Sequence, residues 1–146
     1  TNPLLQSILY AMKKGDVRAM QESLSQILCV IVSYFDVKKR REDIYHIFIL
    51  GLFVSFDATY DIRSNRESGY GRYDIALFPK KTGDPGILLE IKQANEADEM
   101  ETLANEAVVQ IRSERYSTEF TERNIQSINL YAIVFYKKHV LVRKAE

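Results

Sequence analysis

Three charged residues in the middle of the chain have the types and the spacing of a hydrolytic metal site. Asp74 precedes a turn-rich segment at residues 79–86, and Glu90 and Lys92 follow that segment, two residues apart. Side chains two residues apart in a strand lie on the same face of the sheet. A hairpin around residues 79–86 would also bring Asp74 close to Glu90 across neighbouring strands.

Two adjacent carboxylates repel each other, and burying them is costly unless a cation compensates. Magnesium commonly binds one or two carboxylates together with water and a substrate phosphate, and manganese accepts the same oxygen ligands. Lys92 would orient or deprotonate a water beside such a cation. The cation would stabilise charge that develops on a phosphate during hydrolysis. These residue types therefore indicate metal-dependent chemistry on a phosphate ester.

An exposed ion-pair cluster is the alternative interpretation of the same residues, because a Glu-x-Lys tripeptide is common. Against this alternative, Glu90 and Lys92 interrupt a segment that is otherwise apolar, where charged side chains need a specific reason. That segment contains Ile87, Leu88, Leu89 and Ile91.

Hydrophobic periodicity predicts the elements that would position these residues. Three helices are expected first, over residues 4–12, 16–35 and 42–57, the second capped by Asp16. Strands are expected over residues 60–64, 72–78, 87–93, 128–136 and 139–142, with a long helix over residues 96–116. That helix permits a right-handed crossover, so the third and fourth strands are expected to be parallel. The predicted fold is α/β, a mixed sheet with helices on both faces.

The length of 146 residues fits one domain. We expect residues 1–36 to form an N-terminal helical segment packed on the core, and residues 37–146 to form the domain that carries the charged residues. A single cysteine, Cys29, cannot form an internal disulfide, which favours a reducing cytoplasmic setting with Cys29 buried. The longest apolar run, residues 44–56, is too short and too polar to span a membrane.

Several segments carry a more specific signal: residues 42–46 with 50–52, residues 64–74 and residues 86–92, and more weakly residues 107–116 and 133–140. Together, residues 42–142 resemble the PD-(D/E)XK nuclease superfamily. Within it they are most similar to the nuclease-like domain at the C-terminus of certain bacterial AAA-ATPase-like proteins. The resemblance implies a restriction-endonuclease-like core. One departure is Tyr73, which stands where the superfamily pattern has proline.

The resemblance also implies roles for the charged residues. Asp74 and Glu90 would be metal ligands, and the backbone carbonyl of Ile91 would supply a further oxygen. Lys92 would position or activate the attacking water.

Accessory roles follow from the same resemblance. Glu42 would be an additional acidic residue near the metal, and Gln110 an accessory residue on the helix after the third strand. His46 is four residues from Glu42, so one helix face would carry both. It is either a core histidine or a site residue that contacts substrate.

Basic residues are the candidates for phosphate contacts. Arg66 and Arg72 either bind a phosphate through their guanidinium groups or balance Glu67 and Asp74. The basic run at residues 38–41 is either a solvated face or a contact to a nucleic-acid backbone. The formal net charge of the chain is zero, so any positive surface must be concentrated on one face.

The implied function is a metal-dependent nuclease that uses magnesium or manganese on nucleic acid, with DNA favoured over RNA. The alternative is a nucleic-acid-binding or protein-interaction module with weak or no catalysis, attached to an ATPase-like domain.

Overall fold

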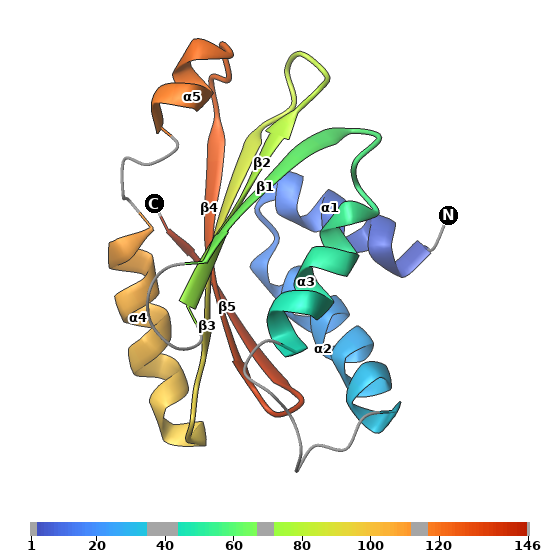
Figure 1. Ribbon diagram of the computed structural model, residues 1–146, viewed down its shortest axis with the longest axis vertical. Coiled ribbons are helices and arrows are strands. Elements are labelled where there is room, and N and C mark those ends of the chain that lie inside the picture. The colour runs from blue at the N-terminus through green and yellow to red at the C-terminus, as the bar shows by residue number, and fades with distance from the viewer. Residues whose placement is uncertain (1–2, 35–43, 67–71, 112–116, 146) are drawn as a thin grey trace.

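The computed structural model describes residues 3–34, 44–66, 72–111 and 117–145 (Figure 1). Three helices come first, then three strands, then three helical segments, and the last two strands end the described part of the chain. The elements are α1 (Pro3–Lys14), α2 (Val17–Tyr34), α3 (Ile44–Val54), β1 (Tyr60–Arg66), β2 (Arg72–Pro79), β3 (Gly86–Gln93), the 3-10 helix η2 (Ala97–Glu99), α4 (Met100–Gln110), α5 (Ser117–Glu122), β4 (Ile128–Tyr136) and β5 (His139–Ala145).

The strands form one mixed sheet in the order β1-β2-β3-β4-β5. All neighbouring pairs are antiparallel except β3 and β4, which are parallel. The parallel pair requires a crossover, and η2, α4 and α5 lie within it. The predicted mixed sheet and the predicted parallel pair are confirmed.

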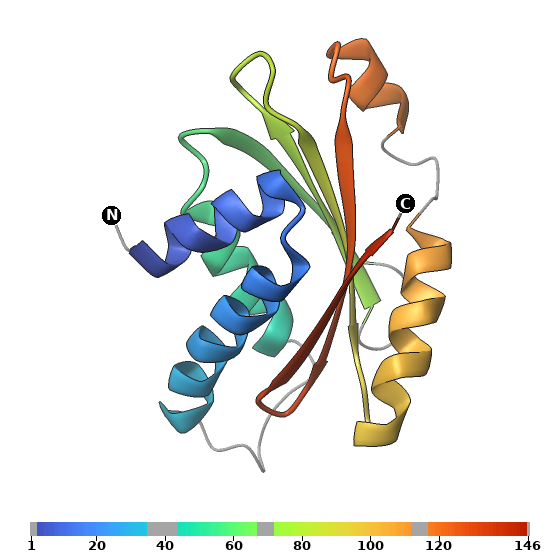
Figure 2. The ribbon, with the colours of Figure 1, turned by 180° about the vertical axis from the view of Figure 1, so that it is seen from behind.

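Strict alternation along the strands divides the core into two layers. In β2 and β3 the odd-numbered side chains, such as Ile75 and Leu89, join the core that contains residues of α1, α2 and α3. The even-numbered side chains, such as Ala76 and Leu88, pack with Phe120 of α5. Helices α1, α2 and α3 accordingly cover one face, and α4 lies on the other (Figures 1 and 2).

Polar side chains of the sheet hold α1 in place. The Tyr131 hydroxyl donates to the Met12 carbonyl at 2.6 Å, and the Asn129 amide donates to the carbonyls of Met12 and Lys13 at 2.9 and 3.1 Å. These carbonyls end the helix and have no partner within it. Burial, together with the nearby carboxylate of Asp16, raises the pKa of Tyr131 to about 12. The N-terminal helices are therefore built into the core.

The helices also correct two expectations. Cys29 is exposed, so its prediction as a buried residue is wrong. The buried positions of α2 are Met20, Leu24 and Leu28, and the next residue is rotated about 100° away from that face. The helix α5 was not expected, because six residues are too few to show a periodicity.

The helix expected over residues 96–116 begins with the 3-10 turn η2, and α4 itself starts at Met100. Asp16 caps α2 as predicted, since its carboxylate accepts the amide of Ala19 at 3.1 Å. Among the helices that the structure describes, none is long and apolar enough to cross a membrane.

The first residue of β3, Gly86, is a close-packed position where any side chain would collide. A Cβ there would lie 2.5 Å from Cε1 of Phe120, which is 1% exposed and packs against Phe78. Because that ring is buried and packed, we expect Gly86→Ala to cost about 1–3 kcal/mol of unfolding free energy. Urea denaturation followed by circular dichroism measures this cost.

Gly51 in α3 is the matched control, because no heavy atom lies within 4 Å of the Cβ that alanine would add. Gly51→Ala should be neutral or stabilising by up to about 1 kcal/mol, since alanine has the higher helix propensity. Equal unfolding midpoints for the two variants would contradict the close packing at Gly86.

Candidate metal centre

The two acidic residues of the predicted site lie opposite each other in the sheet. Asp74 of β2 and Glu90 of β3 are register partners in the antiparallel ladder. Each is only 4% exposed, and Lys92, two residues further along β3, is 3% exposed. The expected pairing of Asp74 with Glu90 across the ladder is thus present in the fold. Because all three side chains are buried, they do not form the exposed ion-pair cluster of the alternative interpretation.

All three side chains belong to the sheet face covered by α4. Alternate residues of a strand point to the same face, so Asp74 lies on the same face of β2 as Ala76. Glu90 and Lys92 lie on the same face of β3 as Leu88. Ala76 and Leu88 both pack with Phe120 of α5. On the side of β3 away from Asp74, the register partner of Glu90 is Ala132 of β4, which is fully buried. A carboxylate pair thus lies beside a small side chain, within an otherwise apolar layer.

Lys92 makes an ion pair with a residue that sequence reasoning missed. Its Nζ lies 3.5 Å from Oε2 of Glu106 on α4. The Lys92 side chain is 4% exposed, whereas that of Glu106 is 54% exposed. A signal was available, because Glu106 precedes Gln110 by four residues, and residues at this spacing share one face of a helix.

The donor set fits a divalent metal that binds oxygen. Within the ranges that the structure describes, no group of three or more His, Cys, Asp or Glu side chains could hold a metal by itself. The pair of Asp74 and Glu90 matches the smaller carboxylate count that magnesium uses when water and phosphate complete its shell. When ionised, Asp74, Glu90, Glu106 and Lys92 together carry a charge of −2, which one divalent cation would neutralise.

Ile91 enters this arrangement only through its backbone. Its side chain is fully buried in the core on the opposite face of the sheet, with residues of α1, α2 and α3. The carbonyl is therefore the only group of Ile91 that can act as a metal ligand.

The other predicted site residues are placed only in part. Arg72 is the backbone partner of Lys92 at the start of β2, and Arg66 ends β1. His46 lies in the first turn of α3, and Gln110 ends α4. The side chains of these four are outside the described part of the structure. Glu42 and the basic run at residues 38–41 lie outside the described residues altogether.

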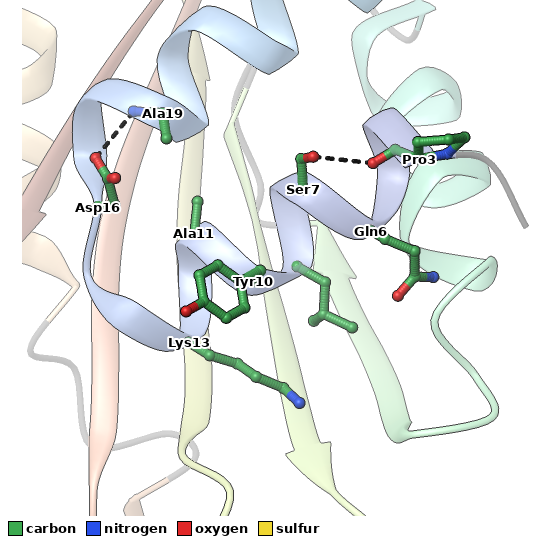
Figure 3. A pocket seen from close by; sticks show the side chains of 9 residues that line it. Pro3, Gln6, Ser7, Tyr10, Ala11, Lys13, Asp16 and Ala19 are labelled. Carbon is green, nitrogen blue, oxygen red and sulfur yellow. Dashed lines mark hydrogen bonds between the residues drawn. The ribbon is translucent and has the colours of Figure 1, made fainter.

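A surface pocket of about 580 Å³ runs along α1 and the start of α2, and it contains none of the predicted site residues (Figure 3). Three of its polar residues take part in local interactions. The Ser7 hydroxyl donates to the carbonyl of Pro3, Asp16 caps α2, and Lys13 pairs with Asp84 at 3.2 Å. The pocket brings together no set of groups for catalysis.

Comparison with known proteins gives one finding. A family model described as the PD-(D/E)XK nuclease superfamily matches residues 40–145. The matched part contains the whole sheet, α3, α4 and α5, and with them Asp74, Glu90 and Lys92. Helices α1 and α2 precede it. Among curated proteins, none matches the chain significantly.

Proposed function

Because the chain belongs to the PD-(D/E)XK nuclease superfamily, we propose that it is a metal-dependent nuclease that hydrolyses phosphodiester bonds, with DNA favoured over RNA. The mixed five-stranded sheet flanked by helices is the restriction-endonuclease-like α/β fold. One observation carries the proposal: Asp74 and Glu90 face each other in the ladder, buried, with Lys92 on the same face.

In this proposal, different residues bind the metal, position the water and contact the substrate. The carboxylates of Asp74 and Glu90, with the carbonyl of Ile91, would hold Mg²⁺ or Mn²⁺. When bound, the metal supplies a positive charge that stabilises the developing negative charge on the phosphate. Lys92 orients the attacking water through its ammonium, or accepts a proton from that water through its amine. Glu42 and Gln110 are accessory residues in this proposal, and Arg66, Arg72 and His46 contact the substrate.

Burial of the three central side chains also favours a second candidate function. Asp74, Glu90 and Lys92 are each at most 4% exposed, which restricts the approach of a bulky polymer. In this candidate the fold serves as a nucleic-acid-binding or protein-interaction module, attached to an ATPase-like domain, with weak or no catalysis.

A cleavage assay separates the two candidates. Labelled single-stranded and double-stranded DNA and RNA are incubated with the protein in Mn²⁺, in Mg²⁺ and in a chelator. The nuclease predicts cleavage with either metal and none with the chelator, because the buried carboxylate pair requires the cation to act on phosphate. Uncleaved substrate under every condition would reject the nuclease and favour the second candidate.

A further inference from the structure

A buried lysine in an apolar layer needs a partner, and its long stem needs a fixed position. Lys92 lies on β3 with its side chain 4% exposed. An ammonium is a compact point charge on a flexible four-carbon stem, so its place is set by what it contacts. From the helix α4, Glu106 contacts this ammonium: its Oε2 lies 3.5 Å from the Lys92 Nζ.

The way α4 packs makes this contact possible. Ala104 and Ala107, on either side of the contact in the helix, are fully buried. Alanine side chains let the helix backbone approach the sheet closely. Glu106 itself is 54% exposed, so its carboxylate reaches Lys92 from the solvent boundary without the desolvation cost of full burial.

We infer that Glu106 is a positioning residue, which fixes the ammonium of Lys92 beside the Asp74 and Glu90 pair. This role rests on the proposed nuclease function, in which Lys92 orients the attacking water. Without the Glu106 carboxylate, the stem of Lys92 samples other rotamers, and the two carboxylates of the sheet compete for its charge. Glu106 acts only through Lys92 and binds neither metal nor substrate.

The substitution that tests this is Glu106→Gln, which keeps the shape of a largely exposed side chain and removes its charge. We expect kcat for metal-dependent cleavage to fall by about 10- to 100-fold, which is the usual loss when a residue that orients a site residue is substituted. KM for the oligonucleotide should stay unchanged. In the Lys92→Met background, Glu106→Gln should cause no further loss, because the residue through which it acts is gone.

Glu101→Gln is the matched control. Glu101 is an exposed glutamate of the same helix, and it forms an ion pair with Arg143 of β5, two strands away from β3 in the sheet. It should leave kcat unchanged. An unchanged kcat in Glu106→Gln, or an equal fall in the Lys92→Met background, would overturn the inference.

A second readout does not depend on activity. In a ¹H–¹⁵N spectrum of the lysine ammonium groups, an ordered Lys92 should give a signal that Glu106→Gln removes and Glu101→Gln retains. If the native protein cleaves nothing, the nuclease proposal fails, and this spectrum alone decides whether Glu106 fixes Lys92. A Lys92 signal that persists in Glu106→Gln would refute it.

Discussion

The Asp74→Asn variant is expected to lose the thermal stabilisation that manganese or magnesium confers on the native protein. A ligand at about 100 times its dissociation constant stabilises the native state by about 2.7 kcal/mol. For a chain of this size, that corresponds to an increase in melting temperature of about 5–10 °C. Asparagine keeps the shape of aspartate but removes the charge that a hard cation requires. Circular dichroism melts with metal and with chelator measure the difference.

Asp61→Asn provides the control for this experiment. Asp61 is an exposed aspartate of β1 that pairs with Arg123 at 3.1 Å. Its substitution should leave the metal-induced shift at the native value. A full shift in Asp74→Asn would show that the metal site is assigned to the wrong residue.

The second large effect is expected at Lys92. Lys92→Met keeps most of the volume of a buried side chain and removes its ammonium. If Lys92 positions or activates water, cleavage should slow by about 10²- to 10⁴-fold, the usual contribution of a positioned acid or base. The metal-induced shift in melting temperature should remain, because Asp74 and Glu90 are intact. Single-turnover cleavage and thermal melts of the same preparation measure the two properties.

Lys80→Met is the matching control, since Lys80 is an exposed lysine whose ammonium donates to the Asp57 carbonyl. It should cleave at the native rate. Loss of both cleavage and the metal shift in Lys92→Met would mean that Lys92 supports the fold or the metal, and would remove its separate role with water.

The central part of the fold was predictable because its signals are local. The short apolar runs of β2 and β3, and the turn between them, define a hairpin whose register opposes Asp74 to Glu90. The strand predicted at residues 128–136 matches β4. The parity of each strand then places Lys92 on the same face as the two carboxylates.

What sequence reasoning missed depends on the packing of distant elements. The spacing of Glu106 and Gln110 predicts only that they share a helix face. The contact of Glu106 with Lys92 also depends on the angle and depth at which α4 lies on the sheet. Cys29 was wrongly predicted to be buried because residues 27–32 are all apolar. Such a run does not show which side of the helix faces the core. The metal assignments of Asp74 and Glu90, and the accessory roles of Glu42 and Gln110, stay predictions.

The central position of β3 determines how rigid the proposed site is. Glu90 and Lys92 lie on a strand whose backbone pairs on both sides, with β2 and with β4. Amide groups in such a strand exchange with solvent chiefly when the whole domain opens, so their local stability approaches that of the entire fold. We therefore expect the backbone beneath these two side chains to open only together with the rest of the sheet. Among the described elements around the site, the rotamers of the charged side chains and the packing of α4 are then the parts that can adjust to metal or substrate.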